Sequence, residues 1–136
     1  MLLSGSANYN LRYAEELVIV PPPFIGMARM VTFFRFVNND SADCTPDVQV
    51  KSTNDKRLAS DDEYIRTYPT RIIAPGEWME DAAPVVMLTH EDSWVVELAA
   101  DITNADAPPT LFVTWLDDQI GAPEARIPPP PVLEFP

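Results

Sequence analysis

The stretch that most constrains the fold is residues 30–39, M-V-T-F-F-R-F-V-N-N, the longest strand-like run in the chain. Side chains of a strand alternate between the two faces of its sheet. One set, which we expect to face a hydrophobic core, comprises Met30, Thr32, Phe34 and Phe36. The other set is too apolar for a face open to water and comprises Val31, Phe33, Arg35 and Val37. The pattern predicts a strand covered on both faces, on one of them by a neighbouring subunit.

The proline content limits the folds that the chain can adopt. Fifteen prolines against four glycines disfavour long helices, because proline breaks helices and central strands. Further short strand patterns, separated by turn residues, cover 16–20, 47–52, 70–73, 78–80, 84–88, 93–100 and 110–116. Residues 61–66 are compatible with a short helical turn or with a loop. These features predict an all-β, two-sheet antiparallel β-sandwich, with jelly-roll and immunoglobulin-like topologies both open.

The chain divides into three parts. We expect an extended N-terminal arm over residues 1–15, a sandwich domain over 16–120 and a Pro-rich C-terminal arm over 121–136. Four consecutive prolines form a stiff polyproline II rod, and large apolar residues follow them. Disordered tails are poor in such residues, so we favour docking over a disordered tail. The predicted docking residues are Pro128, Pro129, Pro130, Pro131, Val132, Leu133 and Phe135.

A second strand contributes to the expected subunit interface. In residues 110–116, T-L-F-V-T-W-L, alternation places the inward set at Leu111, Val113 and Trp115. The predicted interface combines the outward side chains of this strand with those of the first, namely Val31, Phe33, Arg35, Val37, Phe112 and Leu116. We expect a homo-oligomer, with a trimer favoured. Burial of this apolar area would contribute about 25 cal/mol per Å².

Charge excludes several partners. The net charge of −12 argues against a nucleic-acid partner, which requires clustered Lys and Arg, and against an anionic membrane surface. The longest apolar run, residues 17–28, contains three consecutive prolines and is too short to cross a bilayer. The composition favours a soluble protein or a partner with a basic face.

Catalytic chemistry is weakly indicated. A serine–histidine–aspartate set could be written with His90, Asp92 and Ser93, but one turn cannot easily orient all three. Acidic pairs could ligate calcium or cleave glycosides, yet none shows the spacing of a calcium loop. Cys44 is the only cysteine and is expected to be an unreactive thiol. We predict no cofactor and no enzymatic activity.

The three tryptophans separate into two groups. Trp94 and Trp115 alternate in phase with core residues, so we expect both to be buried. Trp78 follows a turn and is the best candidate for exposure. An exposed Trp78 beside Glu77 and Glu80 would suit sugar stacking, as in a carbohydrate-binding or receptor-recognition module.

Residues 16–118 resemble a class of small virion proteins of tailed bacteriophages. The resemblance is carried in order by L-V-I-V-P, V-T-x-F-x-F-V-N-N-D, D-V-Q-V-K, I-I-A-P-G-E-W-M, V-V-M-L, S-W-V-V-E-L-A-A and T-L-F-V-T-W. The A-P-G-E turn with its apolar flanks is the most specific part. The resemblance implies a β-sandwich decoration (cement), collar or head–tail accessory subunit in the virion. It also implies symmetric assembly and contact with a major capsid protein or other virion proteins. Terminal arms suit such subunits, because they can lock neighbours by strand addition or exchange.

Overall fold

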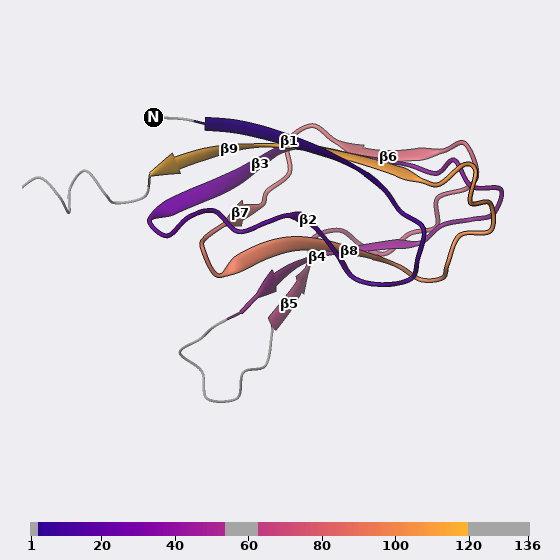
Figure 1. The fold of residues 1–136 in the computed structure, drawn as a ribbon, viewed down its shortest axis with the longest axis horizontal. Coiled ribbons are helices and arrows are strands. Elements are labelled where there is room, and N and C mark those ends of the chain that lie inside the picture. The colour runs from indigo at the N-terminus through magenta and orange to yellow at the C-terminus, as the bar shows by residue number, and fades with distance from the viewer. Residues whose placement is uncertain (1–2, 54–62, 120–136) are drawn as a thin grey trace, which may run out of the picture.

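The structure is a computed structural model that describes residues 3–53 and 63–119. These residues form two antiparallel sheets packed as layers, which confirms the predicted all-β sandwich (Figure 1). No helix in the described part of the chain is long and apolar enough to cross a membrane. The described strands are β1 (Leu3–Asn10), β2 (Leu17–Val20), β3 (Met27–Val37), β4 (Pro46–Ser52), β5 (Glu63–Arg66), β6 (Trp78–Asp81), β7 (Met87–Leu88), β8 (Asp92–Leu98) and β9 (Thr110–Gln119).

Each sheet joins strands that are distant in the sequence. The larger sheet has the order β1-β9-β3-β6, and β7 also pairs with β3. The smaller sheet has the order β2-β8-β4-β5. In Figure 1 the larger sheet is the upper layer and the smaller sheet the lower one. Because the two sheets are stacked, each has an inner face on the core and an outer face.

An aromatic cluster forms the centre of the core. Trp94 and Phe34 are completely buried, and their rings meet edge-on at 5.1 Å between centroids. The ring of Tyr68 stacks on Phe34 at 5.6 Å. The indole N–H of Trp94 donates a 2.8 Å hydrogen bond to the Thr67 hydroxyl, so the one polar group of this side chain is satisfied. The prediction that Trp94 is a core residue is confirmed.

A β-bulge in β3 corrects the predicted alternation. Val31 pairs with Trp115 and Phe33 with Thr114, so Thr32 is an extra residue on the β3 side. The bulge reverses the expected positions of the residues before it. Val31 is 1% exposed and belongs to the core, so its assignment to a subunit interface is wrong. Met30, expected in the core, is 44% exposed.

The expected N-terminal arm is an edge strand of the domain. From Leu3 to Asn10, β1 pairs with β9 through eight consecutive residue pairs. The Tyr9 hydroxyl donates a 2.8 Å hydrogen bond to the Ile19 carbonyl in the other sheet. Gly5 lies opposite Trp115, where a Cβ would collide with the indole. A glycine at this position lets Trp115 lie partly buried against the core.

The structure also differs from the predictions for three short segments. Residues 70–73 provide one isolated bridge, Ile73 to Cys44, because Pro69 and Pro75 flank the segment and limit its pairing. In the expected strand over 84–88, strand structure covers Met87 and Leu88. Glu63–Arg66 forms a strand paired with β4, neither a helical turn nor a loop. The C-terminal arm lies outside the described residues, so its docking stays a prediction.

Candidate functional site

The outer face of the larger sheet is the candidate site. The smaller sheet covers only the inner face (Figure 1). Strand alternation and the pairing register assign the side chains of the outer face. The apolar ones are partly or largely exposed and comprise Met30, Phe33, Val37, Trp78, Met87, Phe112 and Leu116. An apolar sheet face of this kind marks an interaction surface more often than a surface left to water.

A shallow hollow lies at one end of this face, where β3 and β9 run side by side. We call it the Phe33–Phe112 hollow, and its lining is Phe33, Arg35, Val37, Thr110 and Phe112. The two phenylalanine rings are tilted by 56°, with their centroids 5.9 Å apart. These rings provide apolar walls, and Arg35 provides a cation at the rim.

The outer face is close to neutral although the chain carries a charge of −12. Arg35 of β3 lies opposite Glu80 of β6, with 3.7 Å between Nε and Oε1. Both side chains remain almost half exposed, so this pair is worth little stability. By alternation Asp118 also belongs to this face, at the other end of β9. The hollow itself therefore carries no local excess of negative charge.

The structure brings four of the six predicted interface residues together. Phe33, Arg35, Val37 and Phe112 all line the hollow. Leu116 belongs to the same face but lies further along β9, opposite Met30. Whether these residues contact a subunit stays a prediction.

The predicted interface set omits other members of the face. Trp78 pairs with Val37, is 55% exposed as predicted, and extends the apolar surface across β6. Its position after the A-P-G-E turn was the available signal. Met30 was missed because the bulge could not be inferred from alternation alone.

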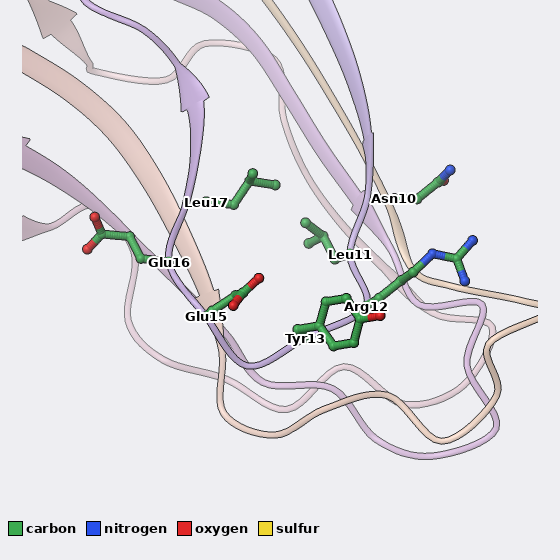
Figure 2. A pocket seen from close by; sticks show the side chains of 7 residues that line it. All are labelled: Asn10, Leu11, Arg12, Tyr13, Glu15, Glu16 and Leu17. Atoms are coloured by element: carbon green, nitrogen blue, oxygen red, sulfur yellow. The ribbon is translucent and has the colours of Figure 1, made fainter.

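A second pocket lies beside the connection from β1 to β2 (Figure 2). Its lining is Asn10, Leu11, Arg12, Tyr13, Glu15, Glu16 and Leu17, and the side chains of Leu11 and Leu17 point toward the same space. Two of the charged side chains in this lining already have partners. Arg12 donates to the Ala105 carbonyl at 2.7 Å, and Glu16 accepts from Lys51 and Tyr64, each at 2.8 Å. These bonds attach the connection to the loop between β8 and β9 and to the smaller sheet.

Catalytic groups do not gather in the described residues. The Asp92 carboxylate accepts hydrogen bonds from the amide and hydroxyl of Thr89, and these bonds close the turn before β8. It also accepts one from the Ser52 hydroxyl. His90 is exposed, and Ser93 is buried. Within residues 3–53 and 63–119, no three His, Cys, Asp or Glu side chains form a group that could hold a metal ion.

Buried polar side chains join the loops at the end of the sandwich near the hollow. Asn38 is completely buried and donates to the carbonyls of Ala42 and Ile73 at 2.9 and 2.8 Å. The Asp40 carboxylate accepts from the amide and hydroxyl of Thr103 and from the amide of Asn104, at 2.8–2.9 Å. These bonds hold the pKa of Asp40 below its usual value, because they favour the ionised form.

Stability should therefore fall in acid. A carboxylate whose pKa is lower in the folded state stabilises the protein above its unfolded pKa, and this contribution disappears as the pH falls through the folded pKa. Hydrogen bonds from Lys51 and Arg66 also lower the pKa values of Glu16 and Asp47. We expect the urea midpoint to drop between about pH 5 and pH 3, where carboxylates take up protons. The drop should be smaller in Asp40→Asn, and an equal drop in the variant would contradict this role.

Cys44 should be unreactive in the folded protein. The thiol is buried and donates a 3.2 Å hydrogen bond to Asn38 Oδ1. Burial, with the nearby charges of Asp40 and Asp43, raises the pKa of Cys44 to about 11. The thiolate is the reactive form, so we expect a chromogenic disulfide reagent at pH 8 to label the native protein at least about 100-fold more slowly than the urea-unfolded protein. Equal labelling rates in the two states would show that the thiol is accessible.

Comparisons with known proteins do not identify a family for this chain. No family model matches the sequence, and no curated protein matches it significantly. Among solved structures, the CBM22-1 xylan-binding domain of Paenibacillus barcinonensis Xyn10C aligns with a TM-score of 0.40 and 15% sequence identity. The alignment covers 86% of this chain and 73% of that chain. A likeness at this level is one of general shape and indicates no function.

Proposed function

We propose that the protein is a non-enzymatic structural subunit of a bacteriophage virion, a capsid decoration (cement) protein that assembles as a homo-oligomer. The observation that carries the assembly part is the apolar outer face of the larger sheet, which the second sheet leaves uncovered. The virion assignment rests on the sequence resemblance described above. A trimer is the oligomer that we favour, with the major capsid protein or another virion protein as the further partner.

The chemistry of the outer face suits a protein interface. Interface cores are rich in aromatic residues and methionine and poor in charge. Phe33 and Phe112 form the aromatic walls of the hollow, and Trp78 lies on the neighbouring strand. Cover by a sister subunit would remove this apolar surface from water at about 25 cal/mol per Å². In a particle with many copies, contacts of moderate strength add up.

Substitution of the two rings tests the proposal. The Phe33→Ser/Phe112→Ser double variant should keep its β-sheet circular dichroism but become monomeric by native mass spectrometry, because the hollow loses both apolar walls. Val18→Ser/Ile65→Ser is the matched control, since Val18 and Ile65 are exposed apolar residues of the smaller sheet.

Capsid binding tests the virion part separately. The unmodified protein should co-sediment with phage capsids that lack a decoration protein. An unmodified protein that is a monodisperse monomer and binds no capsid would contradict the proposal.

A carbohydrate-binding or receptor-recognition role is the second candidate, as on a neck, tail or fibre. The specific observation in its favour is Trp78, which is 55% exposed and lies on the same face as Glu80. An exposed indole can stack on a sugar ring, and a carboxylate beside it can accept hydrogen bonds from the sugar hydroxyls. Glycan-array binding that disappears in Trp78→Ala would support this role, and an array without any binding would argue against it.

A further inference from the structure

The turn between β2 and β3 presents two large apolar side chains to solvent. Phe24 is 86% exposed and Ile25 is 77% exposed. The Met27 amide donates a 3.0 Å hydrogen bond to the Phe24 carbonyl, and Gly26 has a φ of +84°. This is the pattern of a type II turn, whose third residue needs a positive φ. We call Phe24 and Ile25 the apolar tip.

The chain on both sides of the tip is fixed. Residues 21–23 are prolines, which restrict the backbone before the turn. Arg29 donates to the Pro21 carbonyl at 2.8 Å, and its guanidinium also makes two 2.8 Å hydrogen bonds to Asp117 of β9. The tip is therefore held in place before any partner arrives, so that binding through it costs less conformational entropy than binding through a loose loop.

The tip and the Phe33–Phe112 hollow lie at opposite ends of the same pair of strands. β3 and β9 pair from Met27, next to the tip, to Val37, which lines the hollow. The ten residue steps between them span about 33 Å. In Figure 1 β3 runs from the turn after β2, at the left, toward the right of the picture. The tip cannot fill the hollow of its own chain.

We propose that the apolar tip of one copy inserts into the Phe33–Phe112 hollow of the next copy, which makes the homo-oligomer a head-to-tail assembly. This inference rests on the proposed function and names the contact that builds it. Phe24 would add a third ring to the two of the hollow, an arrangement that aromatic side chains favour. Because the two surfaces differ, the contact is heterologous, and its repetition gives a ring when the rotation closes.

The charges near the tip favour a protein hollow, and not a lipid surface, as the site into which the tip inserts. Turns and helices that enter membranes combine apolar residues with free Lys or Arg beside them. Here the adjacent cation, Arg29, is already bound to Asp117, and the chain as a whole is strongly acidic. The lining of the hollow contains no acid, and the charge of its one cation, Arg35, is offset by Glu80 of β6.

Directed cross-linking tests the contact. An Ile25→Cys/Val37→Cys variant should give covalent products larger than a dimer under mild oxidation, because each copy bonds to two neighbours. Each single variant should give almost no covalent product, because neither two tips nor two hollows meet in a head-to-tail contact. Native Cys44 is buried and stays in place in all three proteins. A double variant that cross-links no further than the single variants would overturn the head-to-tail contact.

Native mass spectrometry separates this inference from the proposed function. Phe24→Ser/Ile25→Ser should dissociate the oligomer as fully as Phe33→Ser/Phe112→Ser, whereas Val18→Ser/Ile65→Ser, at exposed apolar sites of the smaller sheet, should leave it intact. If only the hollow variant dissociates, the outer face is an interface and the tip contact is wrong. If the unmodified protein is a monomer, the tip contact and the homo-oligomer part of the proposed function both fail, and capsid binding still decides the virion part. Binding of the unmodified protein to phosphatidylcholine vesicles that the tip substitution abolishes, without any change of oligomer, would assign the tip to lipid and overturn the inference.

Discussion

Replacement of Trp94 by alanine should lower the free energy of unfolding by about 3–5 kcal/mol, the range for large aromatic residues in well-packed cores. Trp94 is completely buried on the central strand β8 and contacts Phe34 and Tyr68. These three rings join the two inner faces of the sandwich, so the cavity cannot close without a shift of both sheets. The substitution also leaves the Thr67 hydroxyl without its indole donor.

Urea unfolding followed by circular dichroism measures this loss. Trp78→Ala is the matched control, because it removes the same side chain from the exposed outer face. The control should change the free energy of unfolding of the monomer by less than about 1 kcal/mol, as is usual at surface sites. Losses of similar size in the two variants would mean that Trp94 is not the centre of the core.

Asn38→Ala should have the second largest effect, about 2–4 kcal/mol, because each buried polar group left unsatisfied costs about 1–3 kcal/mol. The buried Asn38 side chain holds the loop after β3 by hydrogen bonds to its backbone. Its carbonyl oxygen accepts from the Asp40 amide at 2.9 Å, and its amide donates to the carbonyls of Ala42 and Ile73. Alanine would leave the Asp40 amide and the Ala42 carbonyl without these partners.

The adjacent residue provides the control for this prediction. Asn39 is exposed, and its amide donates to the Pro108 carbonyl at 3.1 Å on the surface. Asn39→Ala should therefore cost less than about 1 kcal/mol. Thermal and urea unfolding of the two variants, compared under the same conditions, measure the difference. A loss in Asn39→Ala as large as that in Asn38→Ala would contradict the role of Asn38.

The sequence was sufficient for the elements whose own pattern decides their structure. The alternation around Phe34 and Phe36, and that around Trp94, predicted buried faces in β3 and β8, and both are buried. The proline content excluded long helices. The apolar character of Phe33, Val37 and Phe112 predicted a surface that needs cover, and these side chains line one hollow.

The remaining features depend on pairing between distant residues. The bulge at Thr32 arises where β3 meets β9, and no local signal in β3 marks it. β1 has small polar residues of low strand propensity, and it is a strand because β9 offers it a partner along its whole length. Gly5 could not be recognised as the site that admits Trp115 without that register. A one-residue shift in register changes which face a side chain occupies, which is why Val31 was misplaced.

Sedimentation velocity of the unmodified protein, over a range of concentrations from submicromolar to about 100 µM, tests the central claim most directly, since associations of this kind are governed by mass action. The copies should associate through the outer face of the larger sheet into one discrete oligomer. The fraction of the protein in this oligomer should rise with concentration. A single monomeric species at every concentration would contradict the claim that this face is covered by another copy.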